Sequence, residues 1–372
     1  MGKRFSEDQV ESVIMHKAYI NNTPITGNIE LLPLCNMNCD MCYVRLSSNE
    51  VSDQGGLHSL NDWISIGNQM REAGVLFILL TGGEPLLFPK FQDLYIAYRK
   101  MGFIITINTN GTLIDEKWVD FFKANPPRRI NITLYGKSPS AYQSLCHYEP
   151  GFYKTIHAVQ LLREAKIDVK LASSITKVNV NDIDGLVKIA DDLDVPMRCD
   201  TYMFPAIRER KKPFDEQSRL APDIAAKAYI KALKMEMSPE IFRQFLDEKI
   251  LEVEHILPSE GLNKMKCNAG TCSFTINWQC NMRPCVLLGR PEISVLKYGF
   301  KKSWEYINSE CKKIVLSESC LTCHYRTICQ TCAASELLEM GEYGKAPGYL
   351  CKYSETLYQC ILKEKKLLDK VN

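Results

Sequence analysis

Residues 27–205 show two alternating patterns of apolar and polar positions, one of strand length and one of helix length. Short apolar runs that predict strands lie at 29–32, 75–80, 103–108, 129–134, 168–174 and 197–203. Amphipathic stretches that predict helices lie between them, at 60–73, 91–101, 115–124, 153–165 and 183–193. Strict alternation of strands and helices is typical of a parallel sheet. We therefore expect an α/β fold whose sheet is open or curled into a barrel.

The regular alternation ends after Pro205, where a charged run at 208–212 follows. Two further helices are predicted at about 222–235 and 239–256. From Cys267 onward, short segments and closely spaced cysteines predict a small domain held together by metal more than by an apolar core. The expected divisions are an N-terminal extension at 1–26, a partial barrel at 27–205, a helical bridge at 206–266, a cysteine-rich domain at 267–360 and a C-terminal tail at 361–372.

Composition is typical of a globular protein and gives few further indications of its class. The chain has 372 residues, enough for about two domains, and its 45% apolar content is sufficient for a core. A net charge of +2 predicts neither a nucleic-acid nor a membrane partner. No apolar run reaches membrane-spanning length and no signal peptide opens the chain, so a cytoplasmic protein is expected. In a reducing compartment, clustered cysteines usually bind metal.

The first group of cysteines follows the first predicted strand. Cys35, Cys39 and Cys42 are spaced by three and then two residues, and the next cysteine along the chain is the distant Cys146. Three thiolates can hold three irons of a four-iron cluster and leave the fourth iron open. An open iron can chelate a small molecule through an amino group and a carboxylate. A zinc site or a set of buried thiols is the alternative interpretation.

Polar residues also follow other predicted strands, where the chemistry of parallel α/β sheets is found. Residues 81–85, with the sequence Thr-Gly-Gly-Glu-Pro, follow the second strand, and 108–111, with the sequence Asn-Thr-Asn-Gly, follow the third. Ser173 and Ser174 end the fifth strand. Since the carboxyl ends of parallel strands lie at one edge of a sheet, these residues and the three cysteines are expected to converge on one site.

The cysteine spacing and the Gly-Gly-Glu-Pro sequence together resemble the radical S-adenosylmethionine (radical SAM) superfamily. The resemblance implies a partial (β/α)6 barrel with S-adenosylmethionine at the open iron. An ordinary turn at Asn110 and a plain strand-end hydroxyl at Ser173 remain alternatives. The residues implied to contact the cofactor are Tyr43, Gly82, Gly83, Glu84, Pro85, Asn110 and Ser173.

Eight later cysteines resemble the SPASM domain, which follows the barrel in enzymes that modify peptides and proteins. The resemblance implies two auxiliary iron–sulfur clusters with interleaved ligands. Auxiliary cluster I would be held by Cys267, Cys272, Cys285 and Cys332, and auxiliary cluster II by Cys320, Cys323, Cys329 and Cys351.

Cys280 complicates this assignment, because it stands where the SPASM pattern has glycine and could replace Cys272 as a ligand. A pair of structural zinc sites is the alternative interpretation of the whole group. The remaining cysteines are expected to be small core residues: Cys146, Cys199, Cys311 and Cys360.

The family resemblance also implies the reaction. A flavodoxin or ferredoxin would reduce the first of three 4Fe-4S clusters, and cleavage of S-adenosylmethionine would give a 5′-deoxyadenosyl radical that removes hydrogen from a substrate. Two saturated auxiliary clusters suit removal of an electron, which would make the net reaction an oxidation. No general base is identifiable in the sequence.

Two positions favour a peptide substrate. Tyr135-Gly136 resembles maturases of ribosomally synthesised peptides (RiPPs), and Val286 stands where sulfatase-maturing enzymes have an Asp. The prediction is a RiPP maturase that forms a carbon–carbon or thioether crosslink in a ribosomally made precursor peptide. The alternatives are a formylglycine-generating sulfatase maturase and, more remotely, a non-catalytic zinc-binding module.

Overall fold

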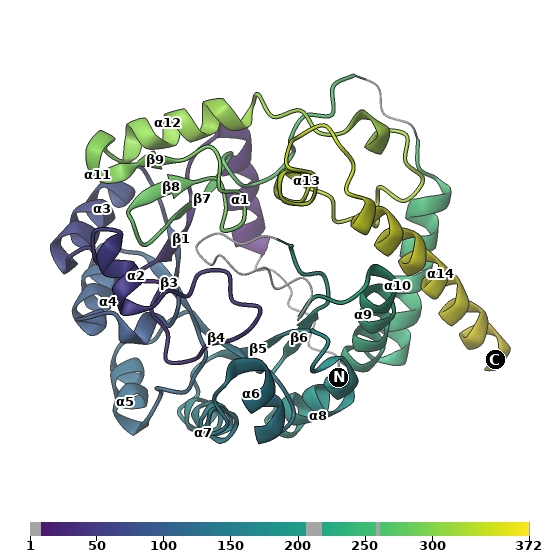
Figure 1. Cartoon of the computed structure of the whole chain (residues 1–372), viewed down its shortest axis with the longest axis horizontal. Helices are drawn as coiled ribbons and strands as arrows, with labels where there is room; N and C mark the ends of the chain where they lie inside the picture. The colour runs from purple at the N-terminus through teal and green to yellow at the C-terminus, as the bar shows by residue number, and fades with distance from the viewer. Residues whose placement is uncertain (1–8, 206–217, 258–260, 372) are drawn as a thin grey trace.

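A computed structural model describes residues 9–205, 218–257 and 261–371 of the chain (Figure 1). The charged run at 208–212 lies outside the described residues. One sheet of nine strands organises the described structure, in the order β6-β5-β4-β3-β2-β1-β7-β8-β9. Figure 1 shows this sheet curled, with the helices around its outer face.

The six predicted strands are confirmed, and neighbouring strands pair in parallel. They are β1 (Thr26–Glu30), β2 (Phe77–Thr81), β3 (Ile104–Thr109), β4 (Arg129–Thr133), β5 (Val169–Ser174) and β6 (Met197–Asp200). The five predicted helices between them are also confirmed, within two residues at each end. They are α3 (Leu60–Glu72), α4 (Phe91–Lys100), α5 (Glu116–Ala124), α7 (Gly151–Glu164) and α8 (Ile183–Asp192).

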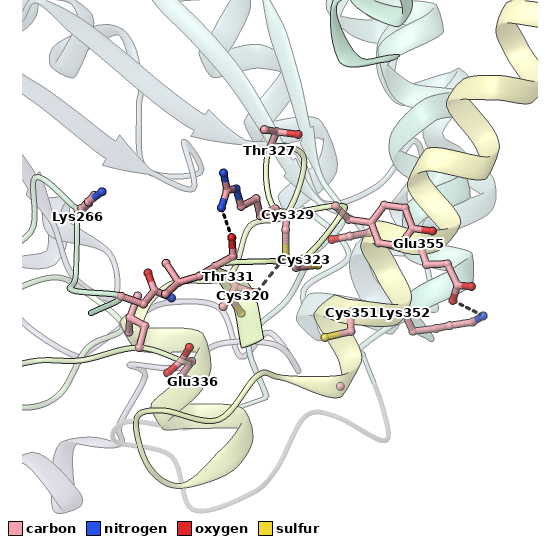
Figure 2. Close-up of a pocket in the computed structure, with 17 residues that line it drawn as sticks. Lys266, Cys320, Cys323, Thr327, Cys329, Thr331, Glu336, Cys351, Lys352 and Glu355 are labelled. Atoms are coloured by element: carbon pink, nitrogen blue, oxygen red, sulfur yellow. Dashed lines mark hydrogen bonds and ion pairs between the residues drawn. The ribbon is translucent and has the colours of Figure 1, made fainter. Parts of the chain in front are cut away.

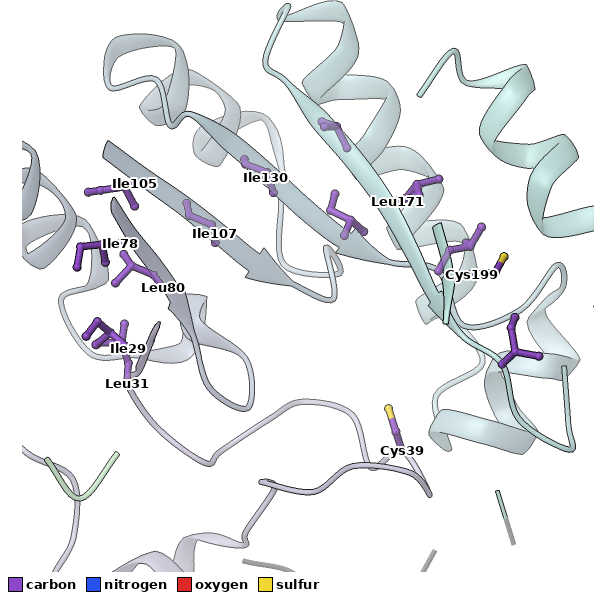
Figure 3. Close-up of a cluster of buried hydrophobic side chains, with 14 of the residues drawn as sticks. Ile29, Leu31, Cys39, Ile78, Leu80, Ile105, Ile107, Ile130, Leu171 and Cys199 are labelled. Atoms are coloured by element: carbon purple, nitrogen blue, oxygen red, sulfur yellow. The ribbon is translucent and has the colours of Figure 1, made fainter. Parts of the chain in front are cut away.

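The barrel core lies between the sheet and these helices. Branched side chains at alternate strand positions are almost completely buried there, as Figure 3 shows for successive strands. Ile78, Ile107 and Ile130 each expose 1% or less of their surface. This alternation assigns one set of strand residues to the core and leaves the other set on the inner face of the curled sheet.

Further helices and turns occupy segments that have no periodic pattern of apolar residues. They are α1 (Gln9–Asn21), α2 (Ser48–Asp53), α6 (Pro139–Cys146), and the 3-10 turns η1 (Pro85–Leu87) and η2 (Val180–Asp182). Helix α6 begins where the Ser138 side chain accepts a hydrogen bond from the Ala141 N–H, with Pro139 in its first turn. Its carboxyl end lies beside the first cysteine loop, as described below.

The cysteine-rich region continues the barrel sheet. Strand β7 (Ser273–Ile276) pairs in parallel with β1, and β8 (Asn281–Arg283) and β9 (Ile293–Ser294) continue it antiparallel. The fully buried Phe274 ring packs against Phe300, with 5.0 Å between ring centroids. The expectation that this region has little core is therefore wrong for residues 273–311.

Helices α11 (Val295–Tyr298) and α12 (Phe300–Cys311) follow β9, and η3 (Glu318–Cys320) and α13 (Ala333–Met340) come after them. The predicted bridge helices are α9 (Pro222–Glu236) and α10 (Pro239–Glu254), and both contact α14 (Gly348–Val371). Helix α14 runs without a break through the boundary expected at residue 360, so 361–371 continue a helix. The Lys234–Glu364 ion pair, with nitrogen and oxygen 2.7 Å apart, ties its last turns to α9.

Helix α9 also covers the free edge of the sheet. The backbone N–H of Cys199 in β6 donates to a Glu236 carboxylate oxygen at 3.0 Å. That contact occupies a group which an edge strand would otherwise offer to another strand. Within the described residues, no helix is both long enough and apolar enough to span a membrane.

Candidate functional site

A cavity of about 320 Å³ opens at the carboxyl ends of the barrel strands, where the sequence predicts a site. All three cysteines of the first group line it, together with Tyr43. The strand ends complete its wall through Gly82, Gly83, Asn108, Thr109, Asn110, Thr133, Tyr135 and Ser174. The structure thus brings the cysteine loop and four strand ends to one cavity.

Backbone hydrogen bonds fix the cysteine loop from the side of α6. The N–H of Asn38 donates to the Cys146 carbonyl at 3.1 Å, and the N–H of Asp40 donates to the Leu145 carbonyl at 3.0 Å. The last carbonyls of a helix have no partner within the helix, so they are free to accept these bonds. The end of α6 therefore holds the loop segment around Cys39.

The glycine pair fixes the same loop from the opposite side. The N–H of Gly83 donates to the Leu32 carbonyl at 2.7 Å, and the N–H of Glu84 donates to the Leu34 carbonyl at 2.8 Å. A Cβ atom on Gly83 would lie 2.2 Å from the Leu34 carbonyl oxygen. Gly82 has a backbone φ of +143°, which residues with a side chain rarely adopt. Both glycines are therefore required for the close approach of two backbone segments.

Asn110 joins the end of β3 to the first cysteine. Its amide nitrogen donates to the Asn36 side-chain oxygen at 2.9 Å and lies 3.7 Å from the Cys35 sulfur. The Asn36 amide in turn donates to the Thr112 hydroxyl at 2.8 Å, and that hydroxyl donates to Asn110 at 2.6 Å. Asn36 and Thr112 were not predicted as site residues, because the network closes only when strand β3 and the cysteine loop meet.

Glu84 lies next to the cavity but does not line it. Its carboxylate accepts hydrogen bonds from the Thr109 hydroxyl at 2.8 Å and from the Asn110 N–H at 2.9 Å. A third bond comes from the Leu86 N–H at 3.1 Å. Burial raises the pKa of this carboxyl to about 7, although the three donors act in the opposite direction. These contacts give Glu84 a role in joining η1 to the end of β3.

Strand alternation places the serine pair differently from the prediction. Ser174 lines the cavity, whereas Ser173 is fully buried on the other side of β5. The Ser173 hydroxyl has no hydrogen-bond partner among the described residues. Pro85 is also buried and does not line the cavity. The structure therefore brings Ser174 to the site instead of Ser173.

The thiols of the first group fit a cationic cluster better than a metal-free state. Burial, together with the charges of Glu84, Cys39 and Cys42, raises the pKa of Cys35 to about 12. The Met37 N–H, 3.4 Å from the Cys35 sulfur, favours the thiolate. Neighbouring buried thiolates repel one another unless positive charge lies between them, which iron would supply.

A second and larger cavity, of about 730 Å³, lies between the cysteine-rich segment and α14 (Figure 2). All four thiols expected at auxiliary cluster II line it: Cys320, Cys323, Cys329 and Cys351. Burial raises the pKa of Cys320 to about 11, and the charges of Glu336 and the other three thiols contribute. The four predicted ligands are therefore neighbours.

Glu336 supports this second site from α13. Its buried carboxylate accepts hydrogen bonds from the Ser317 N–H at 2.9 Å and from the Gly344 N–H at 2.8 Å. These bonds connect the segment before Cys320 with the loop that leads to α14. One side chain therefore links two of the segments that carry the thiols of this cavity.

The thiols expected at auxiliary cluster I are less evenly placed. Burial and the charges of Cys332 and Cys267 raise the pKa of Cys285, so these three sulfurs are neighbours. Burial raises the pKa of Cys272 to about 11, and the charge of Cys267 contributes. Cys280 is buried in the apolar core, and this burial and the charge of Asp62 raise the pKa of its thiol.

Across the described residues, no three His, Cys, Asp or Glu side chains are close enough together to hold a single metal ion. A four-iron cluster places its ligands further apart, because each thiolate binds a different iron.

Tyr202 forms the wall of the first cavity on the side of α13. Its hydroxyl donates to the Glu339 carboxylate at 3.1 Å, and Glu339 forms a buried ion pair with Arg219. The Arg219 guanidinium lies over the Tyr349 ring, 3.6 Å from its centroid. This network joins the end of β6 to α13 and α14. No local pattern in the sequence indicated it, since its members are far apart along the chain.

Comparison with known proteins identifies the barrel. Residues 29–193 match the family described as the radical SAM superfamily. The AdoMet-dependent heme synthase of Methanosarcina barkeri is 22% identical, over 90% of this chain and 98% of its own length. The subtilosin biosynthesis protein AlbA of Bacillus subtilis is 24% identical, over 76% of this chain and 59% of its own length.

The same fold occurs in a solved structure, the Streptococcus suis protein SuiB bound to its precursor peptide SuiA. It superposes with a TM-score of 0.61 at 14% identity, covering 93% of this chain and 82% of SuiB. At that identity the likeness concerns the fold alone. It extends beyond residues 29–193 and includes the cysteine-rich region.

Substitution of Gly83 by Ala should damage the first site selectively. Its Cβ would collide with the Leu34 carbonyl and separate the cysteine loop from β2, so iron bound at this site should fall at least several-fold. Anaerobic reconstitution followed by iron analysis and EPR measures this loss. Gly289→Ala is the matched control, because no atom lies within 4 Å of its added Cβ. Equal iron loading in the two variants would contradict the proposed packing role.

Glu84 should make stability depend on pH. Its folded pKa is raised to about 7, so its stabilising contribution is complete at acidic pH and is lost as pH rises through that value. Between about pH 6 and pH 8 the wild type should lose about 1 kcal/mol relative to Glu84→Gln. Thermal unfolding of both proteins across this range measures the difference. The control Glu72→Gln, at an exposed position, should show the same pH dependence as the wild type. A wild type that gains stability relative to Glu84→Gln as pH rises would contradict this prediction.

Proposed function

We propose that this enzyme generates a radical from S-adenosylmethionine and uses it to modify a peptide oxidatively, because residues 29–193 match the radical SAM superfamily. The observation that carries the proposal is the convergence of three thiols, two glycines and Asn110 on one cavity. A zinc site would require neither a pair of glycines beside it nor a set of only three thiols.

The residues that would hold the first cluster are Cys35, Cys39 and Cys42. When bound, the cluster and S-adenosylmethionine supply a 5′-deoxyadenosyl radical that removes a hydrogen atom from the substrate. Tyr43, Gly82, Gly83 and Asn110 line the cavity and would orient the cofactor. For Glu84, Pro85 and Ser173, which do not line it, the proposal is an indirect role through their neighbours.

The surrounding side chains would keep water and solvent protons away from the radical. Tyr135 and Tyr202 present aromatic surface to the cavity, and Leu287 reaches it from the cysteine-rich region. The Tyr202 ring also packs on Phe204, with 4.8 Å between centroids. Apolar walls of this kind limit side reactions of a reactive intermediate.

The cysteine-rich region would hold the two auxiliary clusters, which gives three 4Fe-4S clusters in the chain. Its neighbouring thiols are of the type that binds such clusters, and four thiolates for each cluster leave no iron open. Clusters without an open iron exchange electrons instead of binding substrate. The proposed reaction is therefore a net oxidation, with a flavodoxin or ferredoxin as the external reductant of the first site.

A peptide is the substrate favoured by the relatives and by the sequence. AlbA is described as a bacteriocin biosynthesis protein, and SuiB was solved with a precursor peptide. The Tyr135-Gly136 pair and Val286 favour a RiPP maturase over a sulfatase maturase. We infer that the product is a carbon–carbon or thioether crosslink in a ribosomally made precursor.

A second candidate substrate is an iron porphyrin. The Methanosarcina heme synthase aligns over 98% of its own length, further than AlbA does. That observation favours an AdoMet-dependent reaction on a porphyrin within the same barrel and cysteine-rich framework. Both candidates use the same first site, so they differ only in what enters the cavity.

Mass spectrometry of the product distinguishes the substrates. The reduced enzyme with S-adenosylmethionine should convert the peptide encoded by a small reading frame beside its gene to a product lighter by two hydrogen atoms. Tandem fragmentation should locate the new bond. The Cys35→Ala variant should leave the peptide unchanged.

Two results would overturn the peptide-crosslinking proposal. Conversion of an iron porphyrin to heme, with the peptide unchanged, would establish the second candidate. Conversion of a Cys-containing sulfatase peptide to an aldehyde would establish a formylglycine-generating enzyme.

A further inference from the structure

We propose that Asn108 binds a main-chain carbonyl oxygen of the substrate peptide, and that Asn131 holds the Asn108 amide in the orientation which this contact requires. The inference rests on the proposed function, which names a peptide as the substrate. It adds a substrate contact to the first cavity, for which the sequence predicts cofactor contacts.

The two asparagines lie next to each other on the inner face of the curled sheet. Asn108 in β3 is the register partner of Asn131 in β4. Their chain neighbours Ile107 and Ile130 are fully buried on the helix side of the sheet (Figure 3). Since successive side chains of a strand occupy opposite faces, both asparagines lie on the inner face of the barrel. Asn108 lines the first cavity, and so does Thr133, two residues after Asn131 on the same face.

One hydrogen bond between the two side chains determines which end of the Asn108 amide is free. The Asn131 side-chain nitrogen donates to the Asn108 side-chain oxygen at 2.8 Å. The Asn108 amide nitrogen, which carries two N–H donors, has no hydrogen-bond partner among the described residues. With its oxygen engaged by Asn131, Asn108 therefore offers the cavity a donor.

Asn110, at the end of the same strand, has both ends of its amide engaged. Its nitrogen donates to the Asn36 side chain at 2.9 Å, and its oxygen accepts the N–H and the hydroxyl of Thr112 at 2.9 and 2.6 Å. Asn108 precedes it by two residues and so lies about 7 Å deeper in the barrel. A ligand can bond to Asn108 without breaking any contact of the described protein, whereas at Asn110 it would displace bonds that hold the cysteine loop.

The lining of the cavity indicates the kind of acceptor that would meet this donor. Among the described residues that line it, none is a Lys, Arg or His. A carboxylate, such as the propionate of a porphyrin, would enter without a cationic side chain to balance its charge, which is unfavourable away from water. A neutral carbonyl oxygen carries no such cost, and every residue of a peptide supplies one.

The surroundings of Asn108 would make this single bond decisive for orientation. Aromatic and apolar side chains form much of the cavity wall, among them Tyr135, Phe204 and Leu287. Ligand sites of this type orient their ligand through a small number of polar groups set among apolar ones. A hydrogen bond in such surroundings is also stronger than one in water. Asn108 would thus fix the peptide backbone while the apolar wall packs on its side chains.

The test measures peptide binding by the anaerobically reconstituted enzyme with S-adenosylmethionine and without reductant, so that no turnover occurs. The probe is the fluorescently labelled peptide encoded beside the gene, and anisotropy gives its dissociation constant. Asn108→Asp should bind this peptide about tenfold more weakly than the wild type, because it still accepts from Asn131 but has no donor. Asn108→Ala should show a similar loss, and the affinity of both variants for S-adenosylmethionine should be unchanged.

Backbone-ester versions of the peptide identify the carbonyl that is bound. An ester carbonyl accepts hydrogen bonds more weakly than an amide carbonyl, so at one position the ester should weaken binding to the wild type about fivefold. The same ester should have no further effect on Asn108→Ala. In Asn131→Leu, which is close in size but cannot donate, the ester effect should fall to about twofold, because the Asn108 amide can then turn.

Asn28→Ala is the matched control and should bind the peptide as the wild type does. Asn28 is half-buried on the inner face of β1, donates to the Thr275 hydroxyl at 3.4 Å and does not line the cavity. Equal peptide binding by the wild type and both Asn108 variants would overturn the proposal. So would lost affinity for S-adenosylmethionine in these variants, or weaker peptide binding without any ester position coupled to Asn108. If neither Asn108 variant folded, an undiminished ester effect in Asn131→Leu would overturn it.

The outcome is separable from the fate of the proposed function. A wild type that binds and converts an iron porphyrin and does not bind the peptide would refute the peptide substrate, and with it this inference. A wild type that crosslinks the peptide, with unchanged peptide binding in both Asn108 variants, would refute only the role of Asn108.

Discussion

The site depends above all on the close approach of two backbone segments, the glycine pair after β2 and the cysteine loop after β1. With any side chain at Gly83, the Leu34 carbonyl could not accept the Glu84 N–H at 2.8 Å. On the opposite side, the last carbonyls of α6 receive the N–H groups of Asn38 and Asp40. The thiols are thus positioned by peptide groups on two sides, which belong to the barrel strands and helices themselves.

The same constraint explains why the Gly-Gly-Glu-Pro sequence and the cysteine spacing predict the site from the sequence alone. Close packing of peptide groups requires glycine at fixed positions, and parallel strands bring their carboxyl ends together. The barrel strands and helices were predictable for a similar reason, since burial on one or both faces imposes regular spacing on apolar residues. Helix α1 and the short helix α6 carry no such regular pattern, and their packing partners are remote in sequence.

Other parts of the site depend on contacts between distant segments, which no local sequence pattern predicts. The Asn36–Thr112 bond and the Tyr202–Glu339 bond each join distant segments. Ser173 and Ser174 differ by one residue, and a shift of one position along a strand reverses the face a side chain occupies. The cysteine-rich region was predicted to be held together by metal more than by an apolar core, because its segments are short and its cysteines closely spaced. Phe274 nonetheless packs in a core formed jointly with α12.

The proposed function requires above all that the thiols at the barrel mouth form a site for reductive cleavage of S-adenosylmethionine. The most direct measurement is the release of 5′-deoxyadenosine by the anaerobically reconstituted, reduced protein supplied with S-adenosylmethionine. The wild type should release it, and the variant in which Cys35, Cys39 and Cys42 are replaced by Ala should release none. No release by an iron-loaded wild type, or equal release by both proteins, would contradict the proposed function.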